Sequence, residues 1–322
     1  MPTAISSSAP HTTAQALPEQ PLAMAAGLAV VVVWGANFAV QKALFEVLSP
    51  AAFMFARYLV MPLAALAMML ALHGSRWPRL PREDLHRIAF LGVIGHTVHV
   101  SLVSHGIHWS TAFSSALILA CGPVFTLLIL HASGIERLTR NQIIGVALAC
   151  TGVLAFLSDK LLARQWAATG GDLVLLFASS LFSYYTVASK PLIQRHGGKT
   201  VMAYATLAGS PLVLLMNIPA AASAPWAAMS TWQWGLLLWS SFVAAFLGWL
   251  AWGWVNERRG VARTAPLMYL MPLVAGLFAW WATGERFGAV KVAAALVTVG
   301  GVALAQFGGR PSAASEAPAQ VD

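Results

Sequence analysis

Four histidines occur close together in one apolar stretch of the sequence: His96, His99, His105 and His108. Imidazole is the side chain whose ordinary pKa lies near neutral pH, so a histidine inside an apolar segment can take up and release a proton there. No Asp or Glu occurs at the middle of any apolar run. We therefore hypothesise that His96 or His99 is a proton-coupling residue. The alternative is a neutral histidine hydrogen-bonded to a neighbour.

A second polar pattern occurs in the first apolar run. Trp34, Asn37 and Gln41 recur at i, i+3 and i+7, which places one aromatic ring and two amides on a single helix face. This face could bind a zwitterion. An internal repeat, described below, maps it onto a second aromatic and polar face that contains Tyr185. The alternative is that Asn37 and Gln41 join neighbouring helices by hydrogen bonds.

Aromatic residues are dense in the later apolar runs. Trp252 and Tyr269 lie deep in their runs and are candidate walls of a binding cavity for an apolar or cationic ligand. Trp280 and Trp281 lie near the end of a run, as is typical of membrane-interface residues. Arg57, near the start of the second run, is either a surface anchor, the interpretation we favour, or a counter-charge for a carboxylate.

The composition excludes an ordinary soluble domain. Of the 322 residues, 58% are hydrophobic and only 9% are charged, whereas soluble domains carry about 25% charged residues. The net charge of +8 comes from small basic clusters between apolar runs, so we expect no nucleic-acid partner. Cys121 and Cys150 lie inside apolar runs without metal-ligand spacing, and we expect both to be small core residues.

Apolar runs of about 20 residues are long enough to cross a bilayer as helices. On this criterion the sequence predicts an all-α integral membrane protein with ten transmembrane helices. The ends of the chain, residues 1–20 and 309–322, are expected to be disordered tails. The expected spans are residues 22–41, 51–72, 87–107, 111–132, 141–158, 172–190, 200–221, 233–255, 263–282 and 289–307.

The distribution of basic residues predicts the orientation. With the amino terminus in the cytoplasm, most Lys and Arg residues of the loops, from Arg76 to Arg310, lie inside. The outer loops then hold Lys42, Lys160, Arg164, Arg286 and Lys291. This positive-inside bias places both termini in the cytoplasm.

The sequence also contains an internal repeat. An offset of 149 residues pairs Pro123 with Pro272 and Gly152 with Gly301, and it pairs two Glu-Arg dipeptides with each other. We expect one repeat over residues 21–158 and a second over 171–308. Because each copy would hold five spans, an odd number, the second must be inverted relative to the first.

Several motifs resemble the EamA family of the drug/metabolite transporter superfamily. They are Trp34-Gly35-Ala36-Asn37-Phe38, Pro123 followed by Gly134-Ile135-Glu136-Arg137, Pro272 followed by Gly284-Glu285-Arg286, and Gly300-Gly301 in the last span. The resemblance covers nearly the whole chain from Leu22 to Phe307. It implies a ten-helix bundle with a central cavity, in the bacterial inner membrane, that transports amino acids or other metabolites.

The resemblance also implies roles for residues outside the cavity. It assigns a structural role to the two Glu-Arg corners, Glu136 with Arg137 and Glu285 with Arg286. Pro123 and Pro272 stand inside their spans, where a missing N–H kinks a helix, so both are candidate hinges for rocking the two halves. A fixed static bend is equally consistent with the sequence.

The function expected from these patterns is secondary transport of a small metabolite, an amino acid or related compound, by alternating access. We expect export, with proton coupling through His96 or His99. The alternative is a haem-binding or other enzymatic multi-helix membrane protein. No phosphate-binding loop or zinc motif occurs in the sequence, so we expect no cofactor, metal site or catalytic residue. The expected partners are the substrate and the lipid bilayer.

Overall fold

The computed structural model describes residues 19–134, 137–162, 166–259 and 265–307. Within these ranges the chain is helical almost throughout and contains no β-strand. The predicted all-α class is therefore confirmed. The predicted tails fall outside the described residues, except that Glu19 and Gln20 already belong to the first helix.

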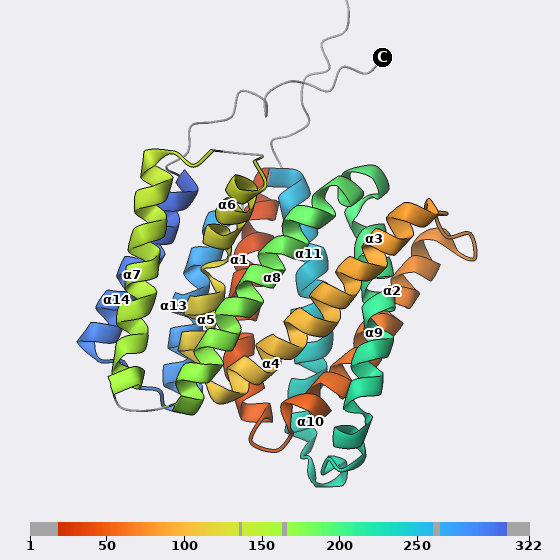
Figure 1. Ribbon diagram of the computed structural model, residues 1–322. Coiled ribbons are helices and arrows are strands. Elements are labelled where there is room, and N and C mark those ends of the chain that lie inside the picture. Colours follow the sequence, from red (N-terminus) through yellow and green to blue (C-terminus); the bar gives the residue numbers. More distant parts are fainter. Residues whose placement is uncertain (1–18, 135–136, 163–165, 260–264, 308–322) are drawn as a thin grey trace, which may run out of the picture.

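The helices follow one another along the chain with short connections (Figure 1). Labels beginning with α denote α-helices, and labels beginning with η denote π- or 3₁₀-helical segments. Their bounds are α1 Glu19–Leu44, α2 Pro50–His73, α3 Arg82–Gly92, η1 Val93–His99, α4 Val100–Trp109, α5 Ala112–Leu119, α6 Gly122–Ala132, α7 Arg140–Leu162, α8 Trp166–His196, α9 Gly198–Ala222, η2 Trp226–Ala228, α10 Thr231–Leu238, η3 Trp239–Leu247, α11 Gly248–Arg259, η4 Ala265–Leu270, α13 Met271–Phe278, η5 Ala279–Thr283 and α14 Ala289–Phe307.

Nine helical stretches of the described chain are long and apolar enough to cross a membrane, and a shorter apolar one covers Leu267–Ala282. Each overlaps one of the predicted spans. Large apolar side chains cover the outside of the bundle; Leu63, Leu154, Leu215 and Leu296 are each at least 62% exposed. Such a surface is stable only against lipid, so the protein is a multi-pass membrane protein.

Local sequence signals set several helix ends. Ser49 caps α2 by accepting a hydrogen bond from Ala52 N at 3.2 Å, and Pro50 follows in the first turn. Ser230 and Gln233 form a capping box at the start of α10. Gly284 ends η5 in the left-handed conformation, with a φ of 68° that favours glycine.

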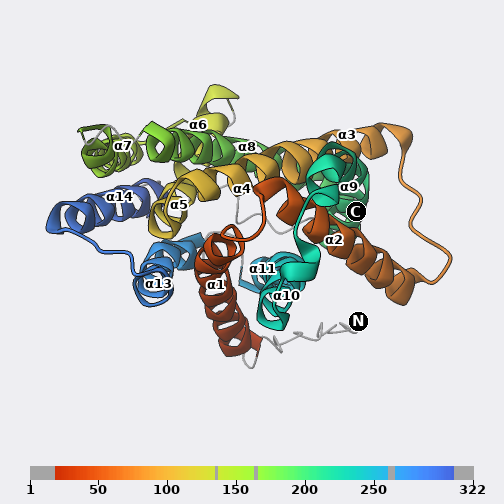
Figure 2. The same cartoon turned by 90° about the horizontal axis from the view of Figure 1, so that it is seen from below.

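The helix contacts form matching pairs between the two halves of the chain. α1 packs against α11 and α13, and α8 correspondingly packs against α4 and against α5 with α6. α2 packs against α9, and α7 packs against α14. Figure 2 shows α7 and α14 side by side at one edge of the bundle. α1 begins and α14 ends at the same end of the bundle (Figure 1), which we call the terminal end. We call the other the opposite end.

Glycines allow α7 and α14 to pack backbone against backbone. A Cβ atom added at Gly301 would lie only 2.8 Å from Gly145 O and 2.9 Å from Ala149 Cα. A Cβ at Gly152 would similarly meet Thr298. Lipid gives no hydrophobic driving force between helices, so this close approach supplies much of their attraction.

We therefore expect Gly301→Ala to lower stability, because the two backbones would have to separate. An overpacked contact of this kind costs about 1–3 kcal/mol. The matched control is Gly300→Ala, since a Cβ there has no neighbour within 4 Å. Thermal unfolding of the purified variants measures the difference. Equal melting temperatures for the two variants would contradict the close packing of α7 against α14.

One of the two cysteines predicted to lie in the core does not. Cys121 is buried as expected, but Cys150 is exposed on α7. An apolar run does not show which of its faces points inward, and thiols tolerate either environment.

Candidate functional site

A group of aromatic, histidine and hydroxyl side chains meets inside the bundle. It includes two residues predicted from the sequence as proton-coupling residues, His96 and His99, which both lie on η1. We define the central cluster as Tyr58 of α2, His96 and His99 of η1, Phe182 and Tyr185 of α8, Thr206 of α9, and Trp249 of α11. Both halves of the chain contribute to it.

His96 is held through both ring nitrogens. Its Nδ1 lies 3.3 Å from Tyr58 Oη, and its Nε2 lies 3.3 Å from Thr206 Oγ1. Thr206 donates its single hydroxyl hydrogen to Met202 O at 2.8 Å, so toward His96 it acts as the acceptor. Nε2 therefore carries a hydrogen, and in a neutral ring Nδ1 then accepts from Tyr58. This network fits a neutral His96.

His99 takes the opposite tautomer. Its Nδ1 lies 2.9 Å from Ala178 O, and a carbonyl can only accept, so Nδ1 donates. Its ring packs against Phe182 with centroids 5.2 Å apart. In a neutral His99 the Nε2 atom is then free to accept a hydrogen bond.

Aromatic rings surround the two histidines. The Trp249 ring centroid lies 5.9 Å from His96, 5.6 Å from Phe182 and 6.3 Å from Tyr185. Such ring faces suit apolar groups and also attract cations.

The backbone that carries the cluster is irregular at corresponding places in the two halves. η1 and η3 are π-helical segments inside the third and eighth spans. π-helical turns often mark functional sites, because they shift side chains off the regular helix faces. His96 hydrogen-bonds to α2 and α9 and its ring meets Tyr185 of α8, whereas His99 hydrogen-bonds to α8.

Arg57 is buried next to the cluster. It is 9% exposed, and its Cζ lies 5.8 Å from the centroid of Phe53. Its Nε has no hydrogen-bond partner, and within the described residues the guanidinium forms no ion pair. Its charge interacts electrostatically with Tyr58, His96 and His99. The favoured sequence interpretation, a surface anchor, is therefore wrong.

Further buried polar atoms without a hydrogen-bond partner in the part of the chain that the structure describes include Gln41 Oε1, Ser179 Oγ and Ser241 Oγ. Ser179 follows Ala178, the acceptor of His99, and Ser241 follows Ser240, which bonds to Asn37. A Cβ atom added at Gly122 would lie 3.6 Å from Ser179 Oγ, so this hydroxyl faces α6.

A second group borders the central cluster. Trp34 Nε1 donates to Ala244 O at 2.8 Å, and Ser240 Oγ donates to Asn37 Oδ1 at 2.7 Å. The Trp34 and Trp252 ring centroids lie 5.5 Å apart, and Trp252 is one turn from Trp249. These contacts join α1 to η3 and α11.

The remaining predicted residues lie elsewhere. Tyr269 is not brought into the cluster, because its hydroxyl donates to Val302 O at 3.3 Å toward α14. Pro123 and Pro272 each stand in the first turn of a new helical segment, α6 and α13, rather than within a continuous helix. The two spans are thus interrupted at matching positions.

The Glu-Arg corners are only partly described. Glu136 lies outside the described residues. Arg137 and Arg286 are exposed. Glu285 Oε1 accepts a hydrogen bond from Ala112 N at 2.8 Å, which links the loop after η5 to the start of α5. This contact is of the kind that a structural role requires.

The family model described as the EamA-like transporter family matches residues 21–158 and again residues 169–307. The chain belongs to the EamA-like transporter family. Proteins of this family are transporters and not enzymes, so the enzymatic alternative has no support.

Several named relatives resemble this EamA protein. A "Probable terminal-alkyne amino-acid exporter" of Streptantibioticus cattleyicolor is 34% identical over 226 residues, covering 69% of this chain and 72% of the relative. A "Probable amino-acid metabolite efflux pump" of Salmonella typhimurium is 27% identical over 296 residues, covering 88% and 94%. A solved crystal structure matches in fold, with a TM-score of 0.64, 17% identity, and coverage of 91% of this chain and 100% of that one.

Both ends of the EamA bundle carry polar groups. At the opposite end an open pocket of about 380 Å³ is lined by side chains that include Lys42, Glu46, His108 and Glu285. There Lys42 Nζ donates to His108 O and Ser110 O at 3.0 and 2.8 Å. Lys42 therefore ties α1 to the end of α4.

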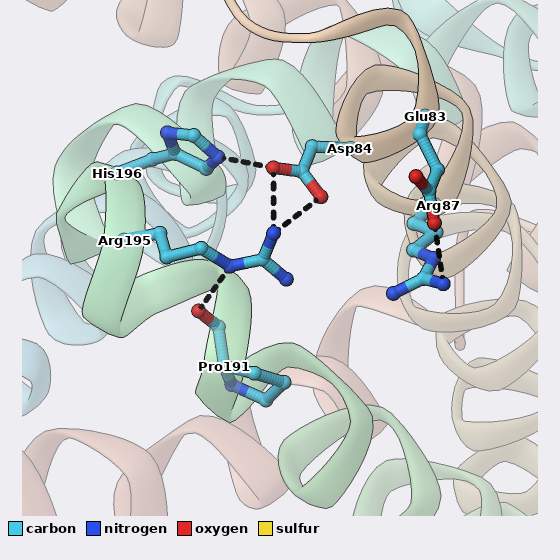
Figure 3. A network of polar contacts seen from close by, with 6 residues as sticks. All are labelled: Glu83, Asp84, Arg87, Pro191, Arg195 and His196. Carbon is cyan, nitrogen blue, oxygen red and sulfur yellow. Dashed lines mark hydrogen bonds and ion pairs between the residues drawn. The ribbon is translucent and has the colours of Figure 1, made fainter.

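At the terminal end, a buried carboxylate joins α3 to α8 (Figure 3). Both oxygens of Asp84 accept from Arg195 Nη1 at 3.0 Å, and Oδ2 also accepts from His196 Nε2 at 2.7 Å. Asp84 is 3% exposed, whereas its neighbour Glu83 pairs with Arg87 on the surface. We call Asp84, Arg195 and His196 the terminal-end ion cluster.

Replacing Asp84 by asparagine is expected to destabilise the protein, because it leaves Arg195 and His196 without the carboxylate that joins α3 to α8. The Asp84 carboxylate is buried although Arg195 is half exposed, so its loss is expected to be more damaging than the loss of a fully exposed pair. The control is Glu83→Gln, one residue away. We expect a clearly lower melting temperature for Asp84→Asn and little change for Glu83→Gln. Similar temperatures for both variants would show that the cluster does not hold the two helices.

Sequence reasoning did not single out several buried polar residues of the structure, among them Tyr58, Thr206, Asp84 and Asp172. Tyr58 and Thr206 are polar residues within apolar spans, which is a weak but usable signal. Asp172 is fully buried at the start of the sixth span and accepts from Ser110 Oγ. Asp84 precedes the predicted third span, and its position there resembles a surface loop.

Proposed function

We propose that this EamA protein exports a small metabolite, an amino acid or a related compound, across the inner membrane. The observation that carries the proposal is the central cluster, where both halves of the chain contribute polar and aromatic side chains. A site between two halves can open to either side as they rock, which is alternating access. The printed names of the exporter and efflux-pump relatives support the substrate class and the direction.

An inverted repeat explains the matching contacts of the bundle. If residues 21–158 and 171–308 are related by a twofold axis in the membrane plane, α1 corresponds to α8 and α4 corresponds to α11. The α1 contact with α11 then corresponds to the α8 contact with α4, and both are present. The α2 to α9 and α7 to α14 contacts would lie on the axis. The family model's two matches support the same division.

The basic residues orient the protein. Arg76, Arg79, Arg82, Arg258 and Arg259 all lie at or near the terminal end of the bundle. By the positive-inside rule this end, with both termini, faces the cytoplasm. Pro123 and Pro272, at the matching helix breaks, are then the hinge candidates for opening each half.

Proton coupling through His96 is part of the proposal. The titratable and charged groups that face it are Tyr58, Tyr185, His99 and Arg57. The nearby Arg57 charge disfavours a second positive charge on His96, and export in exchange for protons requires that proton and substrate occupy the site in turn.

The test is export by living cells. Cells that overproduce the protein are exposed to toxic amino-acid analogues, including L-propargylglycine, which bears a terminal alkyne. We expect lower intracellular analogue and better growth than in cells with an empty vector. The Asn37→Ala, His96→Ala double variant, expressed at the same membrane level, should lose the protection. Higher intracellular levels in the producing cells would contradict export.

A further inference from the structure

We infer that Arg57 is the carboxylate subsite of the central cluster, and that the transported compound is a small carboxylate with an apolar side group. The inference rests on the proposed function and narrows its substrate class. It starts from a charged side chain that is more than nine-tenths buried within the bundle and forms no ion pair in the described part of the protein.

The fold does not supply a partner for this charge. Phe53 and Tyr58 face Arg57 from its own helix, and His96 and His99 face it from η1. None of these is an acid. The buried carboxylates of the described chain bond elsewhere, Asp84 to Arg195 and Asp172 to Ser110.

A buried cation without a counter-charge is strongly unfavourable, particularly at membrane depth. A chain needing Arg57 only for structure would gain stability from a permanent acidic partner. The absence of a permanent acidic partner in the described chain fits a partner that binds and leaves. An arginine guanidinium pairs best with a planar anion that accepts two parallel hydrogen bonds, and a carboxylate has that shape.

The surroundings define the rest of the ligand. Phe182, Tyr185 and Trp249 provide apolar ring faces beside the histidines. No acid is available there for an ammonium group, so an amino acid's ammonium would rest on ring faces and on acceptors such as His99 Nε2. The carboxylate should therefore be essential for binding, and the ammonium should not.

The experiment measures thermal stabilisation of the full-length protein in detergent by matched pairs of compounds. The pairs are 3-phenylpropionate with 3-phenylpropanamide, and 4-pentynoate with 4-pentynamide. L-Phenylalanine and phenethylamine show the separate effects of the carboxylate and the ammonium. We expect only the carboxylates to raise the melting temperature of the wild type. Equal stabilisation by the amides and the acids overturns the inference. So does a melting temperature that no carboxylate raises.

Arg57→Gln tests the residue itself, and Arg87→Gln, at an exposed arginine of α3, is its matched control. We expect Arg57→Gln to need at least a tenfold higher carboxylate concentration than the wild type for the same rise in melting temperature. Arg87→Gln should need the same concentration as the wild type. Arg57→Lys keeps the charge but not the two parallel N–H donors of the guanidinium, so its affinity for carboxylates should be intermediate. Retention of the full carboxylate response by Arg57→Gln would falsify the assignment.

The ligand-free proteins give a second readout. If Arg57 is a binding residue, removing its unpaired charge leaves the melting temperature unchanged or raises it. If Arg57 is only structural, Arg57→Gln melts lower than the wild type without any ligand. That result overturns the inference even when the variant is too unstable for binding experiments.

Flux through proteoliposomes separates this inference from the proposed function. Carboxylates that bind through Arg57 but are never transported would contradict the transporter proposal and leave the subsite intact. Transport of a carboxylate at the same rate by the wild type and Arg57→Gln would contradict the subsite and leave the transporter proposal intact.

Discussion

Replacing His96 and His99 together by glutamine is expected to reduce export at least tenfold and to remove its dependence on pH. Glutamine retains hydrogen-bonding groups but does not change charge between about pH 5 and 8, where imidazole does. The structure places both rings inside the central cluster, with His96 bonded to Tyr58 and Thr206. Initial rates of export at fixed pH values on each side of the membrane measure the effect.

The control for this variant is His131→Gln, because His131 is an exposed histidine at the end of α6. It should keep both the rate and the pH profile of the wild type. If the double glutamine variant is slow but keeps the full pH profile, the histidines bind substrate without coupling protons. If its rate and profile are both unchanged, neither role is correct.

Gly209→Ala is expected to disrupt the same site through the backbone. A Cβ atom there would lie 2.5 Å from Gly92 O and 2.9 Å from His96 Cβ, so α9 would have to move away from α3 and η1. That movement would break the bond from Thr97 Oγ1 to Gly209 O, and it would withdraw Thr206 from His96. We expect a loss of about 1–3 kcal/mol in stability and at least tenfold slower export.

Gly253→Ala provides the comparison for this backbone effect. Gly253 is exposed on α11, and a Cβ there meets nothing within 4 Å. Alanine favours a helix over glycine by about 1 kcal/mol, so this control should be as stable as the wild type or slightly more so. If the two variants have equal melting temperatures and equal export rates, α3 and α9 can move apart without cost, and the prediction is wrong.

The fold was predictable because membrane spans are defined by length and apolarity. Each predicted span overlaps a helical stretch in the structure, and the shortest of them, Leu267–Ala282, shows why boundaries are harder. There a 3₁₀ segment precedes Pro272 and a π-helical one follows, and neither has a hydropathy signal. Helix irregularities of this kind depend on packing, which a linear pattern does not contain.

The site was only partly predictable. Histidines are rare in apolar runs, so His96 and His99 stood out, and the structure places them in one cluster with Tyr185. Their partners Tyr58 and Thr206 come from distant parts of the chain and are ordinary residues in a span.

Arg57 illustrates a different limit. It lies eight residues into α2, close enough to the helix start for its long side chain to reach the surface. Only the packing of α2 against its neighbours in the bundle, chiefly α9, shows that the side chain is buried instead. Asp84 is the converse case. Its polar sequence neighbours indicate an exposed loop, whereas in the structure its carboxylate binds Arg195 and His196.

The most direct test of the central claim is transport by the purified protein in liposomes. The vesicles are loaded with unlabelled L-propargylglycine or another amino acid of the panel, and uptake of the labelled compound is followed. We predict rapid counterflow for the wild type and Glu83→Gln, and at least tenfold slower counterflow for the Asn37→Ala, His96→Ala variant. Equal counterflow in all three proteins would contradict the claim that substrate passes through the central cluster.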